Sequence, residues 1–137
     1  MISDFSSVFE FVCELEETKF DRDTLRRIFE YNISKECHIY LVAVANEEVA
    51  GYVSCHGQQL LHHGGWIYEI QEMFVRSEQR SSGIGKLLMH ELKRRAREKG
   101  ALQLEVTANN SRVATHEFYA REKFHFTHKK FVLKLRL

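Results

Sequence analysis

A serine- and glycine-rich loop between a strand-like run and a helical run is the feature that most constrains this chain. The apolar residues 66–75 predict a strand, Arg80-Ser81-Ser82-Gly83-Ile84-Gly85 follows, and residues 83–99 have the pattern of an amphipathic helix. The first backbone N–H groups of a helix have no partner within it and lie at the positive end of its dipole. Because no bulky side chain covers them here, they can bind a phosphate or pyrophosphate. The sequence therefore predicts an α/β unit that holds a phosphorylated cofactor.

The spacing of this loop argues against two common nucleotide sites. A dinucleotide fingerprint needs a third glycine where this chain has Leu88. A Walker loop needs a glycine at the position of Arg80 and a hydroxyl residue after Lys86, and the chain has neither. A flexible loop without a ligand stays open as the simpler alternative.

Charge and cysteine content limit the class of protein. The 137 residues are the length of one domain, with 44% apolar and 28% charged residues. A net charge of +1 argues against a nucleic-acid partner, and no apolar run is long enough to span a membrane. Cys13, Cys37 and Cys55 are scattered and odd in number, which is typical of reduced thiols. With no leader peptide visible, we expect a cytoplasmic protein.

Hydrophobic periodicity predicts an α/β fold with a mixed central sheet flanked by helices. Ile28 is expected to point inward from the second helix, and Leu87 from the third. The expected helices cover residues 8–17, 21–33, 83–99 and 111–121, and the expected strands cover 39–45, 49–58, 66–76, 102–107, 124–127 and 131–137.

The loop motif Arg80-x-x-Gly83-x-Gly85 resembles the Gln/Arg-x-x-Gly-x-Gly/Ala signature of the GNAT superfamily of N-acetyltransferases. The element order fits that fold over nearly the whole chain, residues 1–137, as one acetyltransferase domain. Members usually begin with a strand, so the first strand here is either short, within residues 2–5, or missing. The resemblance implies that acetyl-CoA is the cosubstrate, and that its pyrophosphate binds to Arg80, Ser81, Ser82, Gly83, Ile84, Gly85 and Lys86.

Glu69 is the candidate general base. A carboxylate in the middle of an apolar strand is unusual, since charges are rarely buried without a partner. Its place eleven positions before Arg80 resembles that of the catalytic glutamate in histone-type members, which acts through water. A structural ion pair or an exposed edge glutamate is the alternative.

Glu72 lies three positions further on, so strict alternation would place it on the opposite face. Family members carry a β-bulge near this point, which would shift the register and let Glu72 bind a substrate ammonium. The bulge would also expose backbone N–H groups near Phe74 and Val75 to the thioester carbonyl. Met73 and Val75 themselves are expected to line the pantetheine arm or the core.

Tyr119 follows Phe118 on the last expected helix, where the family has a tyrosine that protonates the departing CoA thiolate. A buried core phenol is the alternative. Asn109 matches an asparagine that the family uses near the pantetheine arm. The flanking sequence departs from the usual family pattern at Arg112, Thr115 and Lys123.

A closer resemblance covers residues 61–72, with Cys13-Glu14-Leu15 and Phe118-Tyr119-x-Arg121-Glu122. These segments resemble bacterial aminoalkylphosphonate N-acetyltransferases, which implies a small acceptor with an amine and a phosphonate. That group has been linked to a divalent metal, so His62 and His63 are candidates for binding the substrate or a metal. The candidates for phosphonate recognition are Lys19, Arg22 and Arg26.

Two other functions remain open from the sequence. The same chemistry could act on an aminoglycoside, a polyamine or a protein lysine, because Glu69 and Glu72 also suit a polycationic acceptor. A CoA-binding module without turnover would keep the fold and lose the reaction.

An unpaired sheet edge would also allow a homodimer.

Overall fold

The computed structural model describes residues 2–136, which form two compact units, residues 2–106 and 107–136. The first unit contains a short 3-10 helix, Ile2–Asp4, followed by the helices α1 (Phe5–Glu16), α2 (Arg22–Ile33) and α3 (Ile84–Glu98). Its strands are β1 (His38–Ala45), β2 (Glu48–Leu60), β3 (Gly65–Val75) and β4 (Ala101–Val106), with a 3-10 turn at Ser77–Gln79. The second unit contains α4 (Val113–Arg121).

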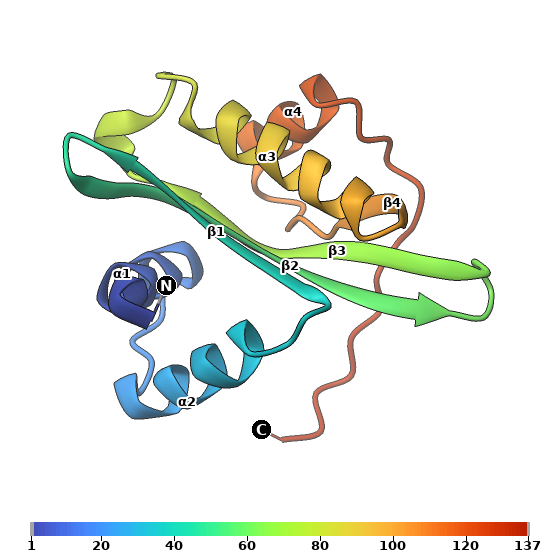
Figure 1. The fold of residues 1–137 in the computed structure, drawn as a ribbon, viewed down its shortest axis with the longest axis horizontal. Helices are drawn as coiled ribbons and strands as arrows, with labels where there is room; N and C mark the ends of the chain where they lie inside the picture. The colour runs from blue at the N-terminus through green and yellow to red at the C-terminus, as the bar shows by residue number, and fades with distance from the viewer. Residues whose placement is uncertain (1, 137) are drawn as a thin grey trace. The chain divides into compact units, whose positions relative to one another are not determined.

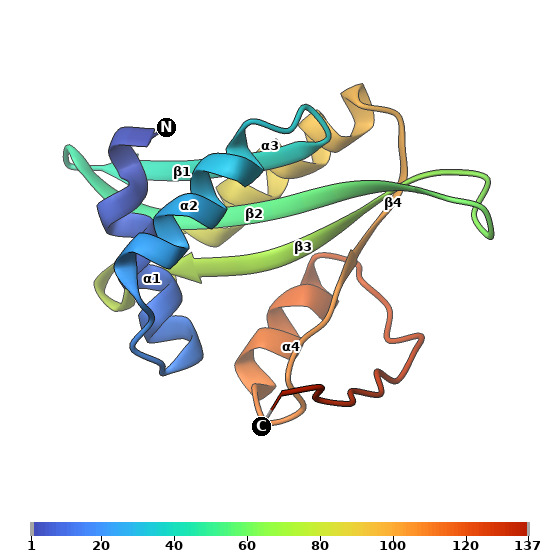
Figure 2. The same cartoon turned by 90° about the horizontal axis from the view of Figure 1, so that it is seen from below.

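The four strands form one mixed sheet in the order β1-β2-β3-β4. The first three are antiparallel neighbours, and β4 is parallel to β3 because α3 connects them as a crossover. Helices α1 and α2 cover one face of this sheet and α3 covers the other (Figure 1, Figure 2). The expected α/β fold with a mixed sheet is confirmed.

An aromatic core fixes α1 and α2 on their face of the sheet. Phe5, Val8 and Phe11 of α1 and Phe29 of α2 are buried against Tyr52 and Phe74 of the sheet. The rings of Phe11 and Phe74 stack with centroids 4.9 Å apart. Asp21 caps α2, because its Oδ2 accepts hydrogen bonds from the Thr24 N–H at 2.9 Å and the Thr24 hydroxyl at 2.7 Å.

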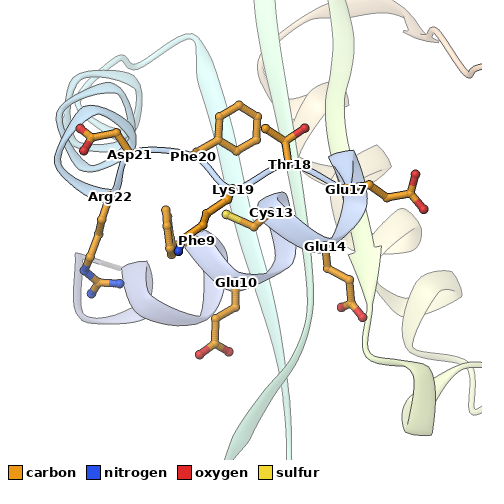
Figure 3. A pocket seen from close by; sticks show the side chains of 10 residues that line it. All are labelled: Phe9, Glu10, Cys13, Glu14, Glu17, Thr18, Lys19, Phe20, Asp21 and Arg22. Atoms are coloured by element: carbon orange, nitrogen blue, oxygen red, sulfur yellow. The ribbon is translucent and has the colours of Figure 1, made fainter.

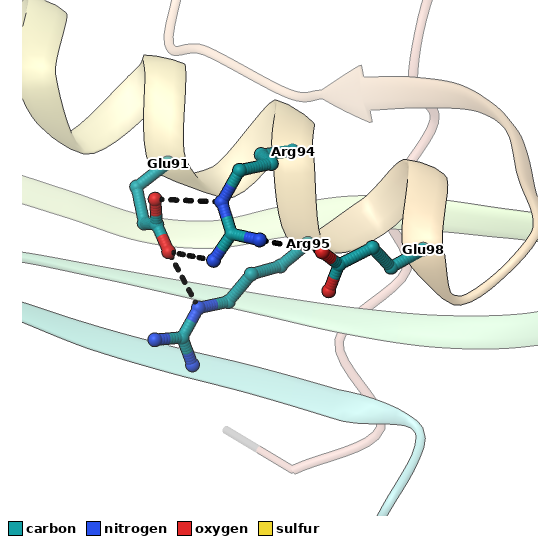
Figure 4. A network of polar contacts seen from close by, with 4 residues as sticks. All are labelled: Glu91, Arg94, Arg95 and Glu98. Carbon is teal, nitrogen blue, oxygen red and sulfur yellow. Dashed lines mark hydrogen bonds and ion pairs between the residues drawn. The ribbon is translucent and has the colours of Figure 1, made fainter.

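The outward face of α3 is a solvated ion network (Figure 4). Glu91 Oε1 lies 2.6 Å from Arg94 Nη2 and 2.9 Å from Arg95 Nε, and Arg94 Nη1 lies 2.5 Å from Glu98 Oε1. Hydrogen bonds from Arg94 and then from Arg95 lower the pKa of Glu91 to about 2. These pairs are exposed, so they contribute little to stability and mainly keep this surface polar.

Several sequence predictions for the elements were wrong. Residues 124–127 and 131–136 form no strand; they pair with no described strand, and Phe131, Leu133 and Leu135 are more than 80% exposed. Strand propensity alone does not order a chain that lacks a hydrogen-bonding neighbour. Leu137 lies outside the described residues. Ile28 and Leu87 are 51% and 64% exposed, so neither points into the core.

The start of the chain is helical. Residues 2–4 form the 3-10 helix and α1 follows at once, so no strand precedes β1 in the described part of the chain. That part also contains no helix with the length and apolar character needed to cross a membrane.

Candidate active site

A β-bulge brings Glu69 and Glu72 to the same face of the sheet. Glu69 lies opposite His56 of β2, whereas Glu72 lies opposite Ser54, and Gln71 is the extra residue between them. His56 and Ser54 are two positions apart on β2, so they share a face, and their partners on β3 share it too. Tyr52 is next along β2 on this face, which is the face that α1 and α2 cover.

Two buried hydroxyls hold the Glu72 carboxylate. Its Oε1 accepts hydrogen bonds from the Ser54 hydroxyl at 2.5 Å and from the Tyr52 hydroxyl at 3.1 Å. The Ser54 oxygen also accepts the Glu72 N–H at 3.1 Å. Glu72 as a whole is half-buried, so part of this residue remains accessible.

Neutral aromatic groups lie beside these carboxylates. The Tyr40 hydroxyl is 2.7 Å from His56 Nε2, and the His56 ring stacks on His38 with centroids 3.7 Å apart. Burial, and then the charge of His38, lower the pKa of His56 to about 4. Burial, and then the charge of Glu72, raise the pKa of Tyr40. Both groups are therefore neutral at physiological pH.

Glu69 also has a carboxylate on its other side, because it lies in register with Glu105 of β4. Glu105 Oε2 accepts a hydrogen bond from Gln103 Nε2 at 2.5 Å and lies 3.9 Å from His63 Nε2. The rings of His62 and His63 are 4.4 Å apart. Residues 2–136 contain no group of three histidine, cysteine or acidic side chains arranged to hold a metal ion, so a metal site at His62 and His63 is not supported.

The pairing of β3 with β4 ends at Ile70 and Val106, and β3 continues alone on that side to Val75. The Arg76 N–H donates to the Ala50 carbonyl on the β2 side at 2.8 Å. The backbone groups of Val75 therefore point away from β2, to the side on which, among residues 2–136, no strand pairs with β3 at this position. There the Val75 carbonyl accepts a hydrogen bond from Arg80 Nε at 2.9 Å. Met73 is half-buried, and the Phe74 side chain belongs to the aromatic core.

The loop before α3 exposes the start of a long helix. Ser81 and Gly83 have φ values of 69° and 90°, and α3 begins at Ile84 without a side-chain cap. Its first internal bond runs from the Leu87 N–H to the Gly83 carbonyl, so the N–H groups of residues 84–86 have no partner within the helix. Nothing lies within 4 Å of where a Gly83 Cβ would be. These residues fit a pyrophosphate.

The second unit holds Tyr119 and Asn109. Tyr119 is buried, with the rings of Phe118 and Phe124 each 5.3 Å away, and burial raises its pKa to about 12. Asn109 Oδ1 accepts hydrogen bonds from the Ser111 N–H at 2.9 Å and the Ser111 hydroxyl at 2.8 Å. This turn delays the start of α4 to Val113, two residues after the expected position.

A pocket of about 970 Å³ lies at the connection between α1 and α2 (Figure 3). Of the three cationic side chains considered for a phosphonate, Lys19 and Arg22 line it. The Arg22 guanidinium lies over the rings of Phe5 and Phe9, at 5.1 and 5.4 Å. The full lining is Phe9, Glu10, Cys13, Glu14, Glu17, Thr18, Lys19, Phe20, Asp21 and Arg22.

Comparison with known proteins decides the family. Residues 5–126 match the Acetyltransferase (GNAT) family. The chain belongs to this family. The GNAT protein is 36% identical over 132 residues to an aminoalkylphosphonate N-acetyltransferase from Salmonella typhimurium strain LT2, and the match covers 96% of this chain and 86% of that relative. It is therefore a GNAT acetyltransferase, of a family that uses acetyl-CoA.

Solved structures agree on the fold. A transcriptional regulator from Bacillus halodurans C-125 has a TM-score of 0.88 at 20% identity, covering 97% of this chain and 94% of that one. A ribosomal-protein-alanine N-acetyltransferase from Brucella melitensis biovar Abortus has a TM-score of 0.80 at 16% identity, with 98% and 95% covered.

Sequence reasoning missed the polar residues of β2 that support this GNAT site. Tyr52, Ser54 and His56 alternate along a strand whose other residues are mostly apolar, and this two-residue period was the available signal. Glu105 was also missed, because only the register of β3 and β4 reveals that it lies beside Glu69.

Proposed function

We propose that this GNAT enzyme transfers the acetyl group of acetyl-CoA to the primary amine of an aminoalkylphosphonate. The observation that carries the proposal is the 36% identity, over nearly the whole chain, to an enzyme named for that activity. The carboxylates of Glu69 and Glu72 on one face of β3 suit an ammonium group. Lys19 and Arg22, which line the pocket at the connection of α1 and α2, suit a phosphonate.

Direct transfer needs a deprotonated amine, a polarised thioester carbonyl and a proton for the leaving thiolate. In our mechanism, Glu69 takes a proton from the acceptor ammonium through a water molecule, while Glu72 binds and orients the acceptor. The amine then attacks the thioester carbonyl, which accepts a hydrogen bond from the Val75 N–H. Tyr119 protonates the thiolate, and its pKa near 12 keeps the phenol protonated for that step.

Cofactor binding in this proposal uses the loop and the first turn of α3. The N–H groups of residues 84–86 bind the pyrophosphate, with Arg80 beside them. Arg80 is already oriented, because its Nε donates to the Val75 carbonyl and its guanidinium lies 5.4 Å from the Phe74 ring centroid. Ser81, Ser82 and Gly83 allow close approach, and Met73 and Asn109 contact the pantetheine arm. His62 and His63 lie at the turn between β2 and β3 as further substrate contacts.

Phosphonate recognition is tested by replacing the cations of the pocket. We expect Lys19→Gln and Arg22→Gln to raise the KM for aminomethylphosphonate by roughly tenfold, the loss of a charge-assisted hydrogen bond. The KM for an amine without a phosphonate should change little. Arg26→Gln is the matched control, because Arg26 pairs with Glu30 at 2.9 Å on the exposed face of α2 and does not line the pocket.

A polycationic amine is the second candidate acceptor, and one observation favours it. The pocket at the connection of α1 and α2 is lined by Glu10, Glu14, Glu17 and Asp21 as well as by its two cations. If spermidine or an aminoglycoside is acetylated with a lower KM than any phosphonate, and Lys19→Gln improves that KM, this second function replaces the first.

A further inference from the structure

Ser54 makes hydrogen bonds to both the backbone and the side chain of Glu72. It is completely buried in the middle of β2, and burying a hydroxyl costs free energy unless it is hydrogen-bonded. Its oxygen accepts the backbone N–H of Glu72 and its hydroxyl donates to the carboxylate of that same residue. One buried hydroxyl therefore fixes both the backbone and the side chain of Glu72, directly after the bulged residue Gln71.

Tyr52 adds a second donor to the same oxygen. It is 2% exposed, and its hydroxyl donates to Glu72 Oε1 at 3.1 Å. Burial, and then the negative charge of Glu72, raise the pKa of Tyr52, so the hydroxyl keeps its proton and remains a donor. Both donors use Oε1, and Oε2 accepts no hydrogen bond from residues 2–136.

The Glu72 carboxylate also lacks a cation. No lysine, arginine or histidine in the described part of the chain lies within ion-pair distance of it. The side chains that bind it are the hydroxyls of Ser54 and Tyr52, which supply hydrogen bonds but no positive charge. Hydrogen bonds offset part of the cost of partly burying this charge, and a cationic ligand would offset more of it.

We propose that Ser54 and Tyr52 are positioning residues, which hold Glu72 in one rotamer and leave Oε2 to bind the ammonium group of the acceptor. The inference rests on the proposed function only in requiring a cationic amine as the acceptor. The phosphonate plays no part in it. The carboxylate is pre-organised, so acceptor binding does not have to order the side chain of Glu72.

The test measures Ser54→Ala and Tyr52→Phe in the full-length enzyme with the best acceptor from a panel of amines. We expect each variant to raise the KM for the amine by roughly tenfold, as for a lost hydrogen bond to a charged group, with the KM for acetyl-CoA unchanged. Tyr68→Phe is the matched control: Tyr68 is a buried tyrosine of β3 next to Glu69, on the opposite face of the sheet. That variant should leave the KM for the amine unchanged.

A double-mutant cycle separates positioning from a purely structural role. If Tyr52 acts through the carboxylate, Tyr52→Phe should have no further effect on the amine KM once Glu72→Gln is present. Any decrease in melting temperature that Tyr52→Phe causes should be the same in the wild-type enzyme and in Glu72→Gln. An unchanged amine KM in folded Ser54→Ala and Tyr52→Phe, or effects that add fully to that of Glu72→Gln, would overturn the inference.

The outcome also separates this inference from the proposed substrate. If the best acceptor lacks a phosphonate and the KM effects hold, the substrate assignment fails and the inference stands. If phosphonates are acetylated and these variants behave as wild type, the inference fails and the assignment stands. If no amine binds or reacts, both fail.

Discussion

Glu69 and Glu72 lie on the same face of β3, although three positions separate them along the strand. In a regular strand such residues point to opposite faces. The extra residue Gln71 at the bulge shifts the alternation of side chains by one position, so Glu69 and Glu72 point to the same face. The acceptor side of the proposed mechanism depends on this relationship, because it gives the proton transfer to Glu69 and the binding of the ammonium to Glu72, so both carboxylates must lie on one face of the sheet.

Replacing Glu69 by glutamine should reduce kcat/KM at neutral pH by about 10²-fold or more, the usual contribution of a general base. The deficit should shrink as the pH approaches the pKa of the acceptor amine, since the amine then loses its proton to water. A pH–rate profile of wild type and Glu69→Gln measures this. Glu98→Gln, in the exposed network of α3, is the control and should resemble wild type. A deficit that is equal at every pH would contradict the role of base.

Replacing Tyr119 by phenylalanine should lower kcat by about tenfold to a hundredfold, a modest general-acid effect because a thiolate is already a good leaving group. The enzyme should not lose activity through Tyr119 below about pH 11, since its pKa is about 12. Tyr31→Phe is the control, because Tyr31 is 63% exposed. A Tyr119→Phe enzyme with wild-type kcat at all pH values would exclude the phenol as the acid.

The same pKa predicts how Tyr119 affects alkaline stability. A phenol is ionised in the unfolded chain above about pH 10, whereas the buried Tyr119 holds its proton until about pH 12. As the pH rises, Tyr119 therefore loses its proton first in the unfolded state. The free energy of unfolding should fall between pH 10 and 12 as a result. In Tyr119→Phe, this part of the alkaline decline should be absent in urea unfolding curves, compared at each pH with Tyr31→Phe.

His56 should titrate far below an ordinary histidine. Its folded pKa is about 4, so the unfolded chain binds this proton first as the pH falls from about 6.5. The stability contributed by neutral His56 should be complete above pH 6.5 and be lost towards pH 4. NMR titration of the ring protons should give a midpoint near 4, assigned by the signal missing from His56→Asn. A midpoint near 6.5 would contradict a neutral, buried His56 ring hydrogen-bonded to Tyr40. His90→Gln, on exposed α3, is the control.

Gly57 is required for packing between strands. A Cβ at this position would lie 2.4 Å from Tyr68 Cζ and 2.7 Å from the Cys37 carbonyl oxygen. We expect Gly57→Ala to lower the free energy of unfolding by about 1–3 kcal/mol, as overpacking does. Gly51→Ala is the milder comparison, with its nearest contact at 3.0 Å to the Ile84 side chain. Urea unfolding measures both, and equal stabilities would contradict the packing argument.

The sequence predicted the parts of this structure that depend on local pattern. The strands that became β1 to β4 and the helix after Gly83 follow from hydrophobic period and turn residues, and the bulge was expected from family resemblance. The support of Glu72 by Ser54 and Tyr52 could not be predicted, because it depends on the register of β2 against β3, and a shift of one residue would reverse every side chain. The expected strands after Phe124 failed for a related reason, since pairing is not encoded in one strand alone.

Steady-state CoA release from acetyl-CoA tests the central claim most directly. The acceptors are aminomethylphosphonate, 2-aminoethylphosphonate, kanamycin, spermidine and a lysine peptide at equal concentration. We predict the highest kcat/KM for the two phosphonates and its loss in Glu69→Gln. Turnover of the polycations alone, or no turnover with any amine, would contradict it.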